Sequence, residues 1–302
     1  MWFWLSLITL LCWSGSDLFS KIGCRDAKDK YSHLKMVMAV GLVMGLHAMY
    51  EIFIGGTEIS LDIIMTYLPV SLLYIGSMAM GYLGLRYIEL SVSSPICNSS
   101  GALVAVMTLF MVGLSEYSPL ALGAVALVCA GAIGLGVVDY FEDEELRAER
   151  QKASNYKYSK SLIALALPVA YCILDAIGTF ADNRVLETLN EDSANAAYEL
   201  TFLFVGIICF IYVVVIKKDK LIPRMEAPKY IGAVCETAGQ FAYIYAIADT
   251  AHLAMSAPII SSYCAASVLW SRIFLKEKLS RKHYLMILLV VTGIAIMGFL
   301  DM

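Results

Sequence analysis

The 302-residue sequence is poor in charged residues. Charged side chains make up 16% of it, against about a quarter in soluble proteins, and the net charge is −4. This composition argues against a soluble globular enzyme, and no basic domain for nucleic acid is present. Because 60% of the residues are hydrophobic and the mean hydropathy is +0.73, we expect most of the chain to face lipid.

Motifs for metals, phosphates and covalent catalysis are also missing. The eight cysteines and four histidines are scattered, with no C-x-x-C and no H-x-x-x-H. No G-K-[ST], G-x-S-x-G or H-E-x-x-H occurs, and the glycines of 131–136 lie inside an apolar run. We therefore expect no metal site, no cofactor, no catalytic residues and no transport driven by ATP.

Ten apolar runs follow one another between short polar connections. Each is long enough to cross a bilayer, and none alternates with the two-residue period of a strand. Backbone groups in hydrocarbon must be satisfied within each segment, so we predict an all-α integral membrane protein with ten transmembrane helices, the first of them retained. The predicted spans are 2–22, 34–54, 66–88, 92–114, 117–138, 161–182, 196–216, 229–248, 252–275 and 283–300.

Positive charge is unevenly distributed. Most of the 22 lysines and arginines lie in or beside the first, fifth, seventh and ninth connections, which share one face of a ten-span chain. The positive-inside rule makes that face cytoplasmic and both termini external. We expect a multi-pass protein of the cell membrane, either an inner or a plasma membrane.

The two halves of the chain repeat one another. Residues 84–96 align with 247–259, and both segments end in S-x-P-I. Trp13 and Asp17, spaced by one helical turn, match Tyr171 and Asp175. Because each half has five spans, the second half must enter the membrane inverted. We predict a 5+5 inverted repeat made of 1–138, a linker at 139–160 and 161–302.

With these features the chain resembles the drug/metabolite transporter superfamily, EamA type. The resemblance rests on W-S-G-S near the start, S-x-P-I at spans four and nine, and the turns S-E-Y-S (115–118) and K-E-K-L-S (276–280). It implies a ten-helix bundle whose cavity is lined by spans one, three, four, six, eight and nine. Members usually have cytoplasmic termini, whereas the loop charges of this chain predict external ones.

Three acids stand inside the predicted spans: Asp17, Asp175 and Glu236. A charge at the bilayer centre costs at least ~2.5 kcal/mol, so each is a candidate for cation binding and proton coupling. The alternative for Asp17 is a local ion pair with Lys21, four residues later. For Asp175 and Glu236 the alternative is hydrogen bonding to neighbouring helices.

Aromatic and amide side chains are expected around these acids. Glu236, Gln240 and Tyr243 share one face of span eight, and aromatic ring faces attract ammonium groups. Pro95 and Pro258 start spans four and nine, and they either free backbone groups for a ligand or simply begin a helix. Packing is the alternative role for each tyrosine. The predicted substrate-binding residues are Trp13, Asp17, Tyr82, Asn98, Tyr171, Asp175, Glu236, Gln240, Tyr243 and Tyr263.

The expected function is secondary active transport of a small polar metabolite by alternating access. A small organic cation or amine, choline-like in its chemistry, is the favoured substrate, and the three acids are available to couple a proton. An amino-acid or nucleoside-like substrate is the alternative within the class. A membrane scaffold subunit or a lipid-modifying membrane enzyme is the alternative outside it. The expected partners are the substrate and membrane lipid, with no nucleic acid, in a monomer or homodimer.

Overall fold

The computed structural model describes residues 1–26, 28–141 and 162–301, and within these ranges all regular structure is helical. Most of the predicted linker 139–160 lies outside the described residues. In chain order the elements are α1 (Trp2–Cys24), α2 (Ser32–Tyr50) continued by η1 (Glu51–Gly55), α3 (Leu61–Tyr87), α4 (Leu90–Cys97), α5 (Ser100–Val112), η2 (Leu114–Glu116), α6 (Pro119–Tyr140), α8 (Leu162–Val185), α9 (Glu191–Phe210) continued by η3 (Ile211–Ile216), α10 (Pro223–Ala248), α11 (Leu253–Ser261), α12 (Tyr263–Trp270) continued by η4 (Ser271–Leu275) and α13 (Arg281–Asp301).

Eight helical segments of the described chain are long and apolar enough to cross a membrane. Two further helices, α8 and α10, have 24 and 26 residues but are not among these eight. Helix α10 contains Glu226, Lys229 and Glu236, which lower its hydropathy and lie buried or half-buried. Eight candidate spans are therefore found where ten were expected, and the ten-helix inverted repeat remains a prediction.

Predicted spans four and nine are each broken in the middle. Helix α4 ends at Cys97 and α5 begins at Ser100, while α11 ends at Ser261 and α12 begins at Tyr263. Pro95 therefore lies inside α4 and not at the start of its span. Pro258 has the same place in α11, three residues before the helix ends. The predicted helix starts are wrong for both prolines.

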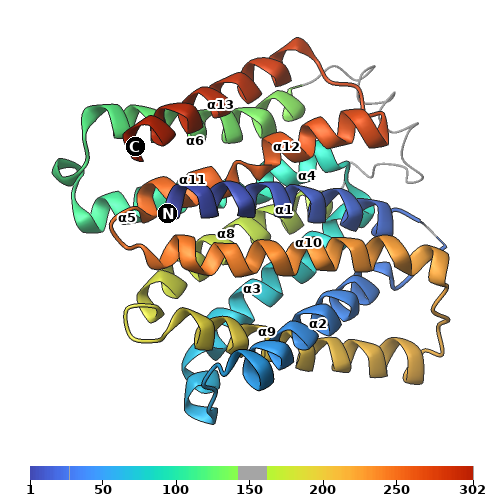
Figure 1. Ribbon diagram of the computed structural model, residues 1–302. Coiled ribbons are helices and arrows are strands. Elements are labelled where there is room, and N and C mark those ends of the chain that lie inside the picture. Colours follow the sequence, from blue (N-terminus) through green and yellow to red (C-terminus); the bar gives the residue numbers. More distant parts are fainter. Residues whose placement is uncertain (27, 142–161, 302) are drawn as a thin grey trace.

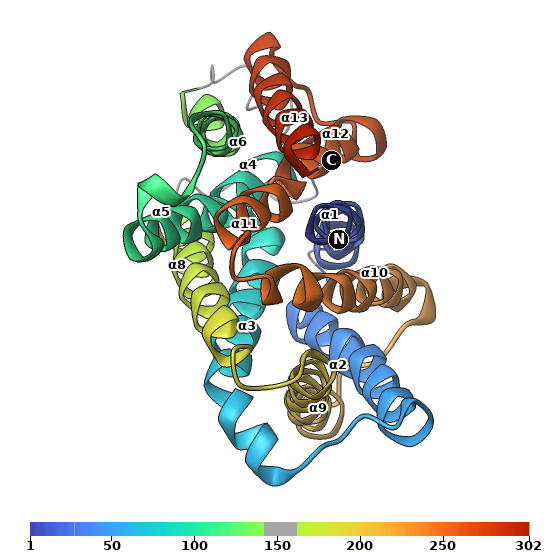
Figure 2. The ribbon, with the colours of Figure 1, turned by 60° about the vertical axis from the view of Figure 1, so that its left-hand side comes forward.

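Helix pairing follows a pattern that exchanges the two predicted halves. The most extensive contacts join α1 to α10, α3 to α8, α2 to α9, and α6 to α13 (Figure 2). In the predicted repeat, α1 corresponds to α8 and α3 corresponds to α10. Exchanging these partners converts the α1–α10 pair into the α8–α3 pair. The same exchange leaves the α2–α9 and α6–α13 pairs unchanged. This pattern supports the predicted pseudo-twofold relation.

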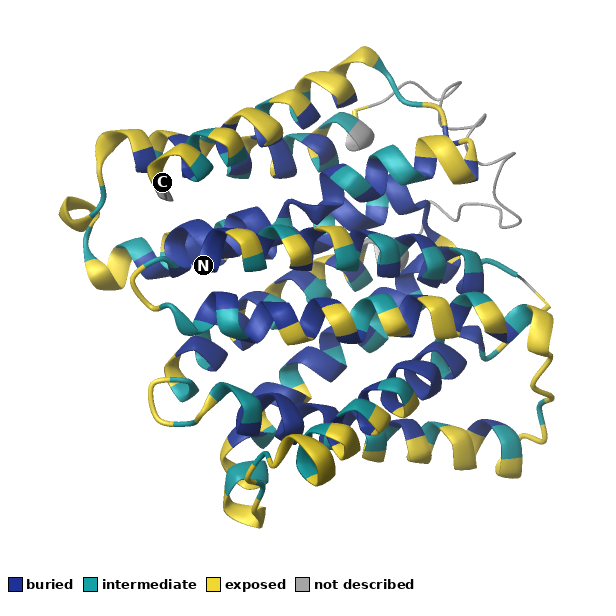
Figure 3. Ribbon diagram, viewed as in Figure 1, coloured by how far each residue is buried: buried dark blue, intermediate teal, exposed yellow. Residues whose placement is uncertain are grey.

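Polar and apolar side chains are distributed as expected for a protein in lipid. Large apolar residues such as Phe53, Phe110 and Phe299 are exposed, and exposed residues concentrate on the outer helices (Figure 3). Serines such as Ser71 and Ser267 are fully buried. Since lipid cannot satisfy hydrogen-bonding groups, polar side chains gather in the protein interior.

The connections lie at two ends of the bundle. The connections that contain residues 25, 26 and 28–31, residues 217–222 and residues 276–280 lie at one end, on the right in Figure 1, which we call the lysine-rich face. Both chain termini lie at the opposite end, which we call the terminal face (Figure 1). Three of the four basic connections, the first, seventh and ninth, thus lie at one end of the described bundle, as the charge pattern predicts.

Candidate functional site

A cavity lies at the centre of the bundle, among α1, α3, α4, α8, α9, α10 and α12. The space free inside it is about 50 Å³. A smaller cavity of about 20 Å³ adjoins it, and the two share Trp13, Tyr171, Asp175 and Tyr263. No residue that lines either cavity is exposed. The helices therefore surround a small internal space.

All ten predicted binding residues lie at these cavities. They bring three carboxylates, five aromatic rings and two amides together from five helices and the α4–α5 break. The larger cavity is lined by Trp13, Asp17, Tyr82, Tyr171, Asp175, Glu236, Gln240 and Tyr263. Asn98 and Tyr243 line the smaller one.

Asp17 connects three helices. Its carboxylate accepts hydrogen bonds from Ser94 Oγ on α4 at 2.5 Å and from Ser267 Oγ on α12 at 2.9 Å. The alternative ion pair with Lys21 is not formed. Because Lys21 Nζ donates to two carbonyl oxygens instead, at the lysine-rich end of the cavity, the two residues do not neutralise each other. The acceptors are Leu85 O at 2.9 Å and Ile88 O at 2.5 Å.

Asp175 and Glu236 also face the cavity without a cationic partner. Asp175 accepts a hydrogen bond of 2.7 Å from Ser100 Oγ on α5, so a contact with a neighbouring helix accompanies its place at the cavity. Glu236 lies near enough to both aspartates for electrostatic interaction. The two cavity linings contain no lysine, arginine or histidine. The site thus has three acids and no positive charge of its own.

Aromatic rings form one wall of the cavity. The Trp13 ring lies 4.9 Å from that of Tyr243 and 5.9 Å from that of Tyr263, measured between centroids. Trp13 Nε1 donates to the backbone oxygen of Glu236 at 3.3 Å, which fixes the indole beside that acid. Gly239 makes room for this ring, because a side chain there would overlap the indole. The rings and acids are held in mutual contact by packing.

The prediction of three interior acids is incomplete. Asp182 on α8 and Glu199 on α9 are also fully buried. Asp182 stood at the end of a predicted span, whereas α8 continues to Val185. Glu199 is close to His47 on α2, whose Nδ1 lies 2.9 Å from its carboxylate. A helix position alone does not reveal such partners, because they come from distant parts of the chain.

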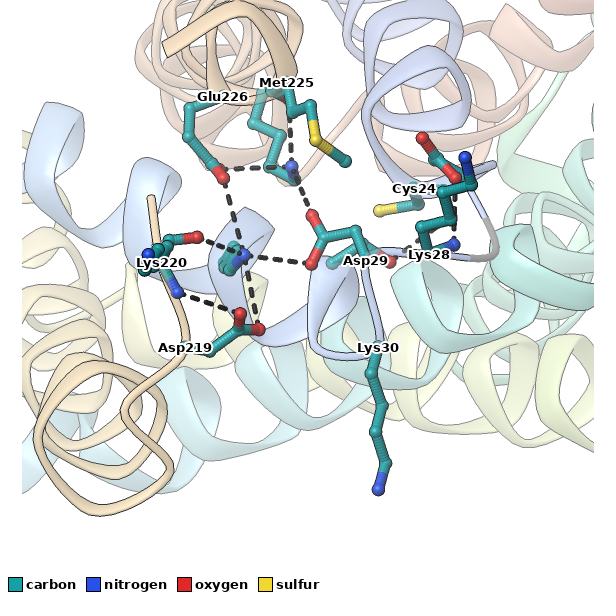
Figure 4. Close-up of polar contacts among 12 residues, drawn as sticks. Cys24, Lys28, Asp29, Lys30, Asp219, Lys220, Met225 and Glu226 are labelled. Carbon is teal, nitrogen blue, oxygen red and sulfur yellow. Dashed lines mark hydrogen bonds and ion pairs between the residues drawn. The ribbon is translucent and has the colours of Figure 1, made fainter. Parts of the chain in front are cut away.

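A network of buried ion pairs lies at the lysine-rich face. Lys35 Nζ is 3.0 Å from Asp29, 3.4 Å from Asp219 and 3.6 Å from Glu226. Lys229 Nζ is 3.1 Å from both Asp29 and Glu226, as the dashed contacts around these acids show in Figure 4. The sequence placed both lysines in or beside exposed connections, but their exposed fractions are 4% and 0%. The network joins α2 to α10 and to two connections.

Comparisons with known proteins agree with this architecture. Residues 160–299 match the EamA-like transporter family, which belongs to the drug/metabolite transporter superfamily. One solved crystal structure is similar with a TM-score of 0.63 and 13% sequence identity, over 98% of this chain and 96% of that chain. At that identity the likeness shows the fold alone. No curated protein matches the chain significantly in sequence.

Proposed function

We propose that this multi-pass membrane protein is a secondary transporter of small organic cations or amines. Its second half matches the EamA-like transporter family. The observation that carries the proposal is the cavity with three carboxylates and no cationic residue in its lining. An unpaired charge is costly to bury. A positively charged substrate compensates the negative charge of the carboxylates. The carboxylates in turn replace the interactions with water that the substrate loses on binding.

The aromatic wall supports the same class of substrate. A desolvated ammonium group gains ~0.5–2 kcal/mol from the face of an aromatic ring. Trp13, Tyr243 and Tyr263 place their rings beside the acids, and Tyr82 and Tyr171 line the larger cavity. An amine surrounded by rings and carboxylates is therefore recognised by both charge and shape.

Alternating access is the proposed mechanism, carried out by two inverted halves of five helices each in an inner or plasma membrane. The exchange pattern of helix contacts supports it. The proposed closure at the lysine-rich end is Lys21 with its two carbonyl partners. The proposed closure toward the terminal face is the set of hydroxyl contacts between Tyr74, Tyr243 and Thr179. Opening one closure while the other holds moves the substrate across, and Asp17, Asp175 and Glu236 are placed to exchange it for protons.

An amino-acid or nucleoside-like substrate is the second candidate within the class. The carboxylate of an amino acid requires a positive partner, and the cavity lining offers none. Lys21 is close to the cavity, but its ammonium group already binds two carbonyls. The site thus favours a cation over a zwitterion. A scaffold or enzymatic role is less favoured, because the family matched by the second half consists of transporters.

Ligand-induced stabilisation tests this proposal with the purified full-length protein. Choline-like ammonium compounds, amino acids and nucleosides are compared for their effect on the unfolding temperature. A ligand that binds only the folded state at about 100 times its Kd adds about 2.7 kcal/mol to the free energy of unfolding. We expect ammonium compounds to stabilise the protein. Stabilisation by amino acids or nucleosides alone would contradict the cation assignment.

A further inference from the structure

A fourth acid, Asp182, lies beyond the cavity toward the terminal face. It is in the last two turns of α8 and is fully buried. Tyr67 OH donates to its Oδ1 at 2.6 Å, and Tyr74 OH donates to its Oδ2 at 3.2 Å. None of the described lysines, arginines and histidines forms an ion pair with it. The carboxylate is therefore held by hydroxyl groups alone.

Hydroxyl groups connect Asp182 to the cavity without a gap. Tyr74 OH lies 2.5 Å from Tyr243 OH, and Tyr243 OH donates to Thr179 Oγ1 at 3.0 Å. Tyr74 lines the larger cavity, and Tyr243 and Thr179 line the smaller one together with Asp175. A continuous chain of hydrogen bonds thus leads from the proposed substrate site to a buried carboxylate.

The hydrogen bonds of these hydroxyl groups can be satisfied both when Asp182 is ionised and when it is protonated. When Asp182 is ionised, Tyr74 donates to it and accepts from Tyr243, and the contact between Tyr243 and Thr179 then has the Thr179 hydroxyl as its donor. When Asp182 carries a proton on Oδ2, it donates to Tyr74, and Tyr74 donates to Tyr243 or to Thr179 Oγ1, which lies 3.3 Å away. Each hydroxyl both donates and accepts, so reversing their directions leaves no buried donor unpaired. A lysine or arginine partner could not accept a hydrogen bond from protonated Asp182, because its side chain only donates.

We propose that Asp182 is a proton-binding site that exchanges protons with the substrate cavity through Tyr74 and Tyr243. The inference rests on the proposed transport function and adds a buried proton site to the three acids of the cavity. In the step, a proton that arrives from the smaller cavity, which Asp175 and Tyr243 both line, passes to Tyr243 OH as the Tyr243 proton passes to Tyr74 OH. The Tyr74 proton passes to Asp182 Oδ2. One O–H bond forms and one breaks at each tyrosine, and the positive charge neutralises the carboxylate.

The groups packed around Asp182 come from four helices, and its proposed proton route to the cavity runs through the hydroxyl groups among them. Helix α3 presents Tyr67 and Tyr74, α10 presents Tyr243, and α8 itself presents Thr179. From α9, the ring of Tyr198 packs edge-on against Tyr74, with centroids 5.9 Å apart. Asp175, two turns earlier on α8, faces the cavity.

The neighbouring Asn183 does not compete for Asp182, because its amide donates to Ile247 O at 2.6 Å. The same tyrosines close the cavity toward the terminal face. A proton on Asp182 removes the negative charge that orders the hydroxyls of Tyr67 and Tyr74. Proton binding is thereby linked to the stability of that closure.

Infrared spectroscopy of the full-length protein in lipid tests the site without a substrate. The difference between spectra at about pH 5 and about pH 9 shows carboxyl groups that gain a proton in this range. We expect a carboxylic C=O band that is lost in Asp182→Asn and retained in Glu199→Gln, which removes another buried acid. In Tyr74→Phe and Tyr243→Phe the band should remain, while its exchange in D₂O slows severalfold.

An Asp182→Asn protein that is folded and gives the wild-type difference spectrum overturns the proposal. If that variant does not fold, Asp182→Glu is used, and the band must shift; an unshifted band overturns the proposal equally. Because no substrate is present, failure of the ammonium assignment does not affect this result. Unchanged exchange in both tyrosine variants refutes the hydroxyl route.

Discussion

The ring of Trp13 lies 4.9 Å from the ring of Tyr243, at an angle of 36°, where α1 meets α10 at the cavity wall. Trp13 also donates to the backbone oxygen of Glu236, so the same indole contacts the aromatic wall and lies beside the residue that carries one of the acids. One residue thus joins the two elements that the proposed cation site requires, a ring face and a carboxylate.

Replacing Trp13 tests the aromatic part of the site. Trp13→Ala should weaken binding of an ammonium ligand by ~0.5–2 kcal/mol, the contribution of a ring face to cation binding. Trp13→Phe should retain most of the affinity, because it keeps a ring. Titration calorimetry with the ammonium ligand measures both. Equal affinities in the wild-type and Trp13→Ala proteins would rule out a role for this ring.

The close contact between α2 and α9 is tested by a matched pair of glycines. A Cβ at Gly41 would lie 2.6 Å from the carbonyl oxygen of Phe202, whereas at Gly123 on α6 it would meet nothing within 4 Å. Gly41→Ala should therefore lower the unfolding temperature, while Gly123→Ala should leave it unchanged or raise it slightly. Thermal unfolding in detergent gives the comparison. Similar effects at both positions would show that the two helices can separate freely.

Lys21 should stabilise the closure at the lysine-rich end of the cavity. In Lys21→Met the buried carbonyls of Leu85 and Ile88 lose their donor, which costs about 1–3 kcal/mol for each unsatisfied group. Lys28→Met, which removes an exposed lysine of the next connection, is the control. Thermal unfolding should show a clear loss for Lys21→Met alone. A stability equal to that of the control would contradict the closure.

The buried ion pairs make a similar but larger prediction. Lys229→Met leaves Lys35 as the one described cation that Asp29 and Glu226 share, and removing a partner from a buried ion pair costs up to about 3–5 kcal/mol. Asp29→Asn in the same protein should restore part of the stability, since it removes one of the two acids that have lost a cation. Lys220→Met, at an exposed position, should have little effect. A Lys229→Met protein as stable as wild type would show that the network is not a structural link.

Sequence reasoning located the cavity better than it located the polar contacts around it. Charge within an apolar run is a local signal, and it pointed to Asp17, Asp175 and Glu236, all of which line the cavity. The repeat pattern added Trp13 and Tyr171 in the same way. What these residues bind is a separate question that position alone does not answer.

The rest depended on contacts between distant segments. Asp182 is held by Tyr67 and Tyr74 from α3, and nothing near it in sequence indicates those partners. Lys229 appeared to belong to an exposed connection because its pairing with Asp29 spans 200 positions. The helix breaks after Pro95 and Pro258 had a visible signal, the prolines themselves. Their distance from the break, however, is set by packing at the bundle centre.

The central claim is that the acids in the cavity bind a positively charged substrate. Uptake of a radiolabelled choline-type cation into proteoliposomes tests it most directly, comparing wild type with Glu236→Gln and Asp175→Asn. Glu199→Gln, which removes a buried acid outside the cavity, is the matched control. We predict that uptake is lost in both cavity variants and retained in the control. Uptake at the wild-type rate in folded Glu236→Gln and Asp175→Asn proteins would contradict the account.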